Sequence, residues 1–255
     1  MRRVRVIPVL LLKDGGLVKS VKFKDFKYVG DPINAVKIFN EKEVDEIVIL
    51  DIDATREGRE PDLEKIKEIA SEAFIPLAYG GGITRIEQIK ELLFNGIEKV
   101  VLNQSALEKP ALITEAARQF GSQSVVVSID VKKNLFGSYK VYQHSRGKNT
   151  KKDPLEFAKE AIRLGAGEIF LNSVDLDGTQ KGYDLTLVEK IAKEIEVPLI
   201  ACGGASGVSN FREAIQAGSS ACAAGSLFVF QGKHRAVLIN YPSQKDLRKE
   251  VFEQI

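Results

Sequence analysis

Several residue types are scarce in this sequence, and each scarcity narrows the fold or function. Tryptophan is absent, and two cysteines, Cys202 and Cys222, in 255 residues cannot form a disulfide framework. The two histidines, His144 and His234, are far apart and have no nearby ligand residues, so we expect neither a metal site nor a cofactor. No apolar run reaches the roughly 18 residues needed to cross a bilayer, and the start, Met1 to Arg5, does not lead into a secretory signal. We therefore expect a cytoplasmic protein with no membrane partner.

The charge balance also has little excess of either sign. With 37 Lys and Arg against 35 Asp and Glu, the net charge is +2. So small an excess gives no support for nucleic acid as a partner. A basic stretch occurs early, between Lys19 and Tyr28, but aromatic residues interrupt it. We interpret this stretch as a solvated loop with aromatic anchors.

Short apolar runs alternate with longer amphipathic stretches along the whole chain, and the pattern predicts a parallel sheet built from β-α-β units. The runs are nearly continuous in Val, Ile, Leu and Ala, as expected of strands buried on both faces. Eight strands are what a closed barrel requires. They are predicted at Val4–Leu12, Ile47–Ile52, Pro76–Tyr79, Lys99–Leu102, Ser124–Ile129, Glu168–Asn172, Pro198–Ala201 and Ala221–Ala224. Helical patterns lie between them, for example at Asp31–Lys42, Asp62–Glu72, Thr84–Asn95, Asp153–Leu164, Leu185–Glu194 and Val208–Ala217.

The second half of the sequence repeats the first. Shifted by 122 positions, Ile75-Pro76-Leu77 falls on Val197-Pro198-Leu199, and Gly80-Gly81-Gly82 falls on Cys202-Gly203-Gly204. The sequence thus predicts one α/β domain over residues 1–255, a (β/α)8 TIM barrel of two half-barrels. We place these at about 1–120 and 121–242, with a C-terminal helix at about 243–255. An open doubly wound sheet is the alternative fold.

Glycine turns follow corresponding strands in the two halves and precede helices. Glycine lets backbone N–H groups approach a ligand, and a helix start carries partial positive charge, so such turns suit a phosphate. Polar helix starts follow about 20 residues after each turn, and barrels commonly build phosphate sites there. Alternatively, the glycines only permit tight turns. We predict two phosphate-binding corners for a phosphorylated small molecule, made by Gly81, Gly82, Asn103 and Gln104 in one half and Gly203, Gly204, Gly225 and Ser226 in the other.

The sequence from Val4 to about Phe230 resembles the cyclase subunit of imidazole glycerol phosphate synthase. The matching stretches are Lys13-Asp14-Gly15, Gly30-Asp31-Pro32, Leu50-Asp51-Ile52, Gly80-Gly81-Gly82-Ile83, Phe120-Gly121-Ser122-Gln123 and Asp175-Leu176-Asp177-Gly178-Thr179. The resemblance implies a (β/α)8 barrel of the lyase class. Such a barrel takes ammonia from a partner glutaminase and uses it to cleave and cyclise a bis-phosphorylated ribonucleotide.

The resemblance also implies a pair of catalytic carboxylates, of which only one is present. Asp130 matches the acid of the fifth barrel strand, whereas Leu11 stands where the family has its aspartate on the first. Asp14, three residues further on, lies about 10 Å away along an extended chain and is a poor substitute. Lys19 matches a mobile substrate-closing lysine of the family, and Asp177 matches a site aspartate.

A charged ring at the N-terminal end of the barrel is retained. In the family four such side chains form a gate where the glutaminase docks, and they correspond to Arg5, Glu46, Lys99 and Glu168. Without the resemblance, an ordinary ion-pair layer closing the barrel bottom would be the simpler interpretation.

In keeping the charged gate but lacking one of the two acids, the sequence is similar to the cyclase paralogues that are found with bacterial surface-polysaccharide genes. The similarity includes Leu10–Lys13, Gly30–Asn34, Gly225–Phe230 and His234–Ile239. In that subgroup the ammonia goes to a separate amidotransferase that makes acetamidino sugars, as in O-antigen. This supply role is our main hypothesis, with weak or absent cyclase activity. The alternatives are a true histidine-pathway cyclase and a non-catalytic phosphate-binding scaffold.

Overall fold

Eight parallel strands close into a barrel in the computed structural model, which describes residues 4–232 and 234–254. Pairing of the first barrel strand with the last and of the fifth with the sixth leaves no open edge. The predicted (β/α)8 fold is therefore confirmed, and the open sheet is excluded. The barrel strands are β1 (Arg5–Lys13), β4 (Ile47–Asp51), β5 (Leu77–Gly80), β6 (Lys99–Leu102), β7 (Val125–Lys133), β10 (Glu168–Ser173), β11 (Leu199–Cys202) and β12 (Ala221–Ala224).

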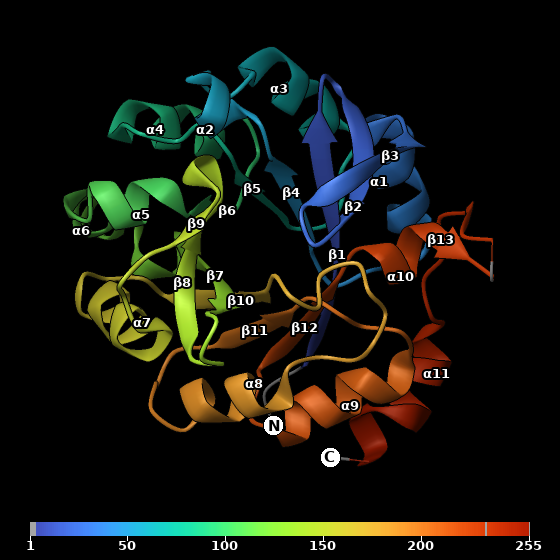
Figure 1. Cartoon of the computed structure of the whole chain (residues 1–255). Coiled ribbons are helices and arrows are strands. Elements are labelled where there is room, and N and C mark those ends of the chain that lie inside the picture. The colour runs from blue at the N-terminus through green and yellow to red at the C-terminus, as the bar shows by residue number, and fades with distance from the viewer. Residues whose placement is uncertain (1–3, 233, 255) are drawn as a thin grey trace.

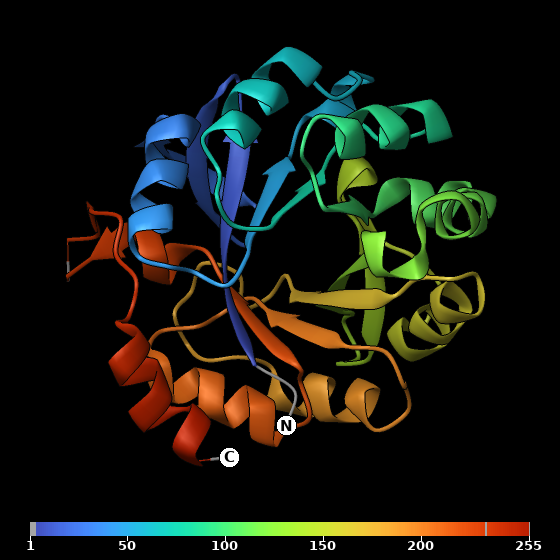
Figure 2. The same cartoon turned by 180° about the vertical axis from the view of Figure 1, so that it is seen from behind.

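Helices surround the barrel and cover its outer face (Figures 1 and 2). Two of them start at the repeated Asp-Pro pair, where the carboxylates of Asp31 and Asp153 accept hydrogen bonds from backbone N–H groups of the first turn. The proline at the first helical position lacks the N–H that would otherwise be unpaired there. The outer helices are α1 (Pro32–Glu41), α3 (Leu63–Ser71), α4 (Ile86–Phe94), α6 (Ala111–Phe120), α7 (Pro154–Arg163), α8 (Leu185–Ala192) and α9 (Val208–Gln216).

Smaller elements occupy the connections that follow the barrel strands. The early basic stretch is a hairpin, not a loop, because β2 continues antiparallel from β1 and pairs with β3. The C-terminal helix is shorter than the predicted 243–255. These elements are β2 (Gly16–Val21), β3 (Lys24–Gly30), α2 (Ala54–Glu57), α5 (Gln104–Glu108), β8 (Tyr139–Gln143), β9 (Lys148–Asn149), α10 (Ser226–Val229), β13 (Phe230–Gln231), β14 (Ala236–Val237) and α11 (Gln244–Glu250), with short 3-10 turns at Ser122–Ser124, His144–Arg146 and Phe252–Gln254.

Two apolar cores lie on either side of the strands. The larger packs the strands against the helices, and the smaller fills the inside of the barrel. The inner core consists of Ile7, Val9, Val48, Ala78, Val101, Val126, Phe170, Ile200, Ala221 and Ala223, with Leu11, Leu50 and Cys202 packed against it. In the described part of the chain, none of the helices combines the length and apolar character that a bilayer span requires.

The strand registers of the two halves correspond. Leu11 pairs with Leu50 across β1 and β4, and Asp130 pairs with Asn172 across β7 and β10. The shift of 122 positions superposes Leu50 on Asn172. The strand pairing then gives Leu11 the register position that Asp130 holds in the second half.

Candidate functional site

A cavity of about 310 Å³ opens at the carboxyl ends of the barrel strands. This is the end at which (β/α)8 barrels place their active sites. Its lining combines inner-core side chains, such as Val101 and Phe170, with polar groups from both halves. We call this cavity the mouth.

Asp130 is the buried acid on the floor of the mouth. Its carboxylate accepts hydrogen bonds from Asn172 Nδ2 at 3.0 Å and from Asn103 Nδ2 at 3.2 Å. Burial raises the pKa of Asp130 to about 6, and the negative charge of Asp177 adds to the effect, while the two amide donors oppose it. An acid with such a pKa can give up or take a proton near neutral pH.

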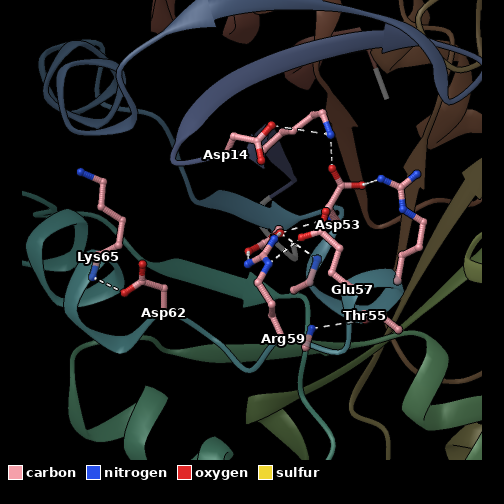
Figure 3. Close-up of polar contacts among 12 residues, drawn as sticks. Asp14, Asp53, Thr55, Glu57, Arg59, Asp62 and Lys65 are labelled. Carbon is pink, nitrogen blue, oxygen red and sulfur yellow. Dashed lines mark hydrogen bonds and ion pairs between the residues drawn. The ribbon is translucent and has the colours of Figure 1, made fainter.

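Leu11 gives the opposite side of the floor an apolar surface. It lines the mouth beside Val9 and Leu50. Asp14 does not replace the missing acid, because its side chain is 77% exposed and lies 3.8 Å from the ammonium group of Lys13 (Figure 3). Among the described residues, no other carboxyl group is hydrogen-bonded to Asp130.

The second-half corner is filled by Lys19. This lysine is only 5% exposed, and its ammonium group donates a hydrogen bond to the backbone oxygen of Val9. It lies so close to Gly225 that a Cβ there would overlap it. Burial lowers the pKa of Lys19 to about 8, against the attraction of Asp177. The predicted phosphate residues Gly203, Gly204, Gly225 and Ser226 are not among the residues that line the mouth.

Asp177 belongs to the same corner as Lys19. Burial raises its pKa to about 6, while the ammonium charge of Lys19 and a hydrogen bond with Ser20 oppose the shift. The backbone oxygen of Asp177 also accepts a hydrogen bond from the N–H of Lys22, which fastens the β2–β3 hairpin over this side of the mouth. The corner therefore contains one cation and one acid in a buried setting.

The first-half corner, in contrast, is open to the mouth. Gly81, Gly82, Asn103 and Gln104 all line it. The N–H of Gly82 donates to Thr55 Oγ1 at 3.3 Å, which ties the glycine turn to α2 (Figure 3).

Asp51 and Asp53 hold the turn that begins α2. Asp51 accepts the backbone N–H groups of Asp53 and Ala54, and Arg59 pairs with its second oxygen at 3.1 Å. Asp53 binds the ammonium group of Lys13 and pairs with Arg56 at 2.9 Å (Figure 3). Asp51 is thus a support for the open corner.

Four further residues also line the open corner, although the sequence analysis did not assign them to it. They are Arg56, His144, Ser145 and Phe23. The Ser145 hydroxyl donates to Gln104 Oε1 at 2.9 Å, and His144 stacks edge-on against Phe23 at 5.0 Å. Burial lowers the pKa of His144. No sequence signal predicts this placement, since His144 comes from the turn after β8, which reaches across the mouth from the opposite half.

Cys202 lies on the floor of the mouth at the end of β11. It is half-buried and packs against the inner core. Burial raises the pKa of its thiol, which therefore stays protonated at neutral pH. Cys202 is therefore a small packing residue on the floor of the mouth.

The four charged residues predicted at the N-terminal end of the barrel are brought together in one ring. Arg5 pairs with Glu46 at 2.5 Å and also with Glu168. Lys99 bridges the same two acids at 2.8 Å and 3.1 Å. The Oε1 atom of Glu46 is buried without a hydrogen-bond partner. Two cations and two acids thus lie below the inner core, at the opposite end of the barrel from the mouth.

These features define a (β/α)8 barrel whose candidate site is a mouth with one buried acid. The family profile described as histidine biosynthesis protein matches residues 5–235. The chain belongs to this family and is of its HisF type.

Two similar proteins carry provisional names as numbered copies of the synthase subunit. One, from Pseudomonas aeruginosa, is named imidazole glycerol phosphate synthase subunit hisF2; it is 54% identical over 97% of this chain and 99% of its own length. Another, from Vibrio vulnificus, is named hisF3 and is 53% identical over 98% and 96%. A protein of Alkaliphilus metalliredigens named imidazole glycerol phosphate synthase subunit HisF is 43% identical over 88% and 89%.

Proposed function

We propose that this chain conducts ammonia from a partner glutaminase to a separate sugar amidotransferase, for acetamidino-sugar formation in a surface polysaccharide. The observation that carries the proposal is the floor of the mouth, where Leu11 takes the register position of an acid opposite Asp130. A hydrocarbon side chain cannot transfer a proton, so the family's two-acid chemistry has lost one of its groups.

The interior of the barrel supports passage of a neutral molecule. The inner core between ring and mouth is apolar, and it favours uncharged ammonia over ammonium because burying an unpaired charge is costly. At its N-terminal end the ring of Arg5, Glu46, Lys99 and Glu168 closes this interior. We propose that the glutaminase docks there and that the ring opens to admit ammonia.

The mouth supports a ligand with an anionic group. Its open corner offers Arg56, Asn103 and Gln104 beside the glycine turn. We propose that one phosphate binds there, and that a second phosphate can bind at the other corner only together with Lys19. The corresponding experiment is a titration with a phosphorylated ribonucleotide, followed by loss of affinity in Arg56→Ala.

The test of the conduit uses glutamine labelled with 15N in its amide. The chain is reconstituted with its glutaminase and the amidotransferase, and label is expected in the amidino product. In Lys99→Ala this transfer should fall at least about tenfold, while Lys99→Arg, which keeps the cation, should retain it. Removal of one partner from a buried charge cluster destabilises the fold, so a thermal melt must show that Lys99→Ala is folded. Normal transfer in a folded Lys99→Ala would refute the conduit.

A histidine-pathway cyclase is the second candidate, and Asp177 favours it. Asp130 and Asp177 lie close enough for the charge of one to raise the pKa of the other, and both pKa values are about 6. Incubation with the bis-phosphorylated ribonucleotide and an ammonium salt separates the two candidates. We expect negligible turnover, and a rate near that of a two-acid cyclase would favour the alternative.

A further inference from the structure

Exposed large apolar side chains gather at the two ends of the barrel. Phe74 lies between α3 and β5, and Phe94 is the last residue of α4; both precede a barrel strand, at the N-terminal end, and are 89% and 90% exposed. The other six lie in connections that follow a strand, at the end that carries the mouth. They are Phe26, Tyr28, Leu135, Phe136, Val237 and Leu238.

The six side chains form two patches on opposite sides of the mouth. Phe26 and Tyr28 on β3 lie on the same side as the segment that carries Val237 and Leu238, since Lys27 between them donates a hydrogen bond to the backbone oxygen of Arg235 at 3.0 Å. Leu135 and Phe136 form the second patch at the turn between β7 and β8. Figure 1 shows β3 and β13 on one side of the barrel and β8 on the other. We call the two patches together the mouth rim.

The Leu135–Phe136 patch has no packing role in the fold. Leu135 is 101% exposed and Phe136 is 93% exposed. Two adjacent apolar side chains projecting fully into water at a hairpin turn are unfavourable unless another surface covers them. Phe26 is different, because it is 40% exposed and also lines the mouth. The rim is thus continuous with the site.

The rim also carries an excess of basic residues, although the chain as a whole is nearly neutral and Lys133, Arg146 and Lys152 pair with acids elsewhere in the chain. Residues 131–152, which contain the Leu135–Phe136 turn, include seven Lys or Arg and no Asp or Glu. On the other side, the segment around Phe26 contains Lys24, Asp25 and Lys27. Arg235 lies nearby and stacks on Phe230 at 4.7 Å. An apolar centre within a basic border fits a protein surface with the same pattern and acidic borders.

We propose that the mouth rim docks the ammonia-accepting amidotransferase, which presents an acidic surface with an apolar centre. This inference rests on the proposed function. Ammonia that escapes into neutral water is protonated and loses the lone pair needed for attack. A partner seated on both patches places the mouth at the centre of its footprint, so that ammonia passes into the acceptor site without meeting bulk water. The two partners would then sit at opposite ends of the barrel, with the glutaminase below and the amidotransferase above.

The first experiment measures binding of the full chain to the purified amidotransferase. The double variant Leu135→Asp/Phe136→Asp should weaken the complex at least about tenfold, and Leu238→Asp on the other patch should also weaken it. Phe94→Asp is the matched control, since Phe94 is as exposed as Phe136 but lies at the opposite end, and its affinity should equal that of the unmodified chain. Added salt should weaken binding as well, because basic and acidic groups meet in this interface.

The second experiment follows amidination with two nitrogen sources in the presence of the glutaminase. Rim variants should lose amidination driven by glutamine but retain amidination driven by an ammonium salt, which needs no docking. Glutamate release by the glutaminase should not change, because that partner binds at the other end.

The outcomes separate the docking from the proposed function. If the unmodified chain supports glutamine-driven amidination and Lys99→Ala abolishes it, but rim variants bind and transfer normally, the docking surface is refuted and the conduit stands. If the unmodified chain transfers no glutamine nitrogen, the conduit itself fails. Self-association of the chain that the rim variants abolish, or binding of RNA to the basic rim in place of the amidotransferase, would also overturn the docking proposal.

Discussion

In the second half of the barrel, the floor of the mouth presents Asp130 and Asn172, joined by a hydrogen bond of 3.0 Å. At the matching register in the first half stand Leu11 and Leu50. The backbone pairing is the same in both halves, so the difference lies in the side chains alone. The proposed loss of one catalytic acid therefore needs no change in the strands that position the floor of the mouth.

The two corners of the mouth also differ, but here the first half is the one that exposes polar groups. In the first half the corner is open and lined by polar groups, whereas Lys19 fills the corner of the second half. The second half thus presents a buried acid, and the first half presents an accessible corner that we propose as the anion-binding one.

The largest expected effect comes from restoring the missing acid with Leu11→Asp. A positioned acid or base contributes about 10²–10⁴-fold to proton transfer, so cyclase turnover with an ammonium salt should rise by about 10² or more. Leu11→Asn has the same size but cannot transfer a proton, and it should show no gain. If both variants remain inactive, cyclase turnover requires more than an acid at position 11.

The second prediction concerns the pH dependence of stability. Because the pKa of Asp130 is raised from 3.8 to about 6 in the folded protein, the native state binds this proton more tightly than the unfolded chain does. The free energy of unfolding should fall as pH rises from about 4 to about 6, by at most about 3 kcal/mol, and then level off. In Asp130→Asn this fall should be smaller. Urea unfolding across that range measures both slopes.

Asp177→Asn serves as the reference for that experiment, because the pKa of Asp177 is also raised to about 6. It should reduce the slope as well, and the double variant should flatten it further. If the slope of the free energy of unfolding against pH is unchanged in Asp130→Asn, the Asp130 carboxyl is not buried on the floor of the mouth.

The third prediction compares the glycine turns. Gly82 and Gly204 both have positive φ, and a Cβ on either would overlap a backbone oxygen, of Arg59 or of Gly182. Alanine at either position should lower the free energy of unfolding by about 2 kcal/mol or more. Gly137→Ala is the control, since its φ is also positive but nothing lies within 4 Å, and it should cost only about 1 kcal/mol. Tolerance of alanine in one half alone would show that the two turns are not equivalent.

The smallest effect is expected for Cys202→Ala. The matching residue of the first half is Gly80, which has no side chain, and the raised pKa keeps the Cys202 thiol protonated. Nitrogen transfer should therefore change by less than about twofold. A large loss of labelled nitrogen transfer from glutamine in Cys202→Ala would show that the thiol has a chemical role in the mouth.

The barrel was predictable from sequence because its signals are local and repeated. Buried parallel strands appear as apolar runs such as Ile47–Ile52, and helix starts such as Asp31-Pro32 carry their own capping groups. The predicted strands and helices agree with the structure to within a few residues. The β2–β3 hairpin was missed, because alternating Lys and aromatic residues with an exposed face resemble a solvated loop.

The sequence by itself determined the fold and the place of Leu11 on the first barrel strand, since both follow from the periodicity of the apolar runs and from the internal repeat. Only the tertiary structure decided which corner is open, that Lys19 is buried beside Gly225, and that His144 and Arg56 share one corner. These facts depend on how the hairpins after β1 and β7 fold back over the mouth. Such packing joins residues far apart in the chain, and no local pattern of side chains encodes it.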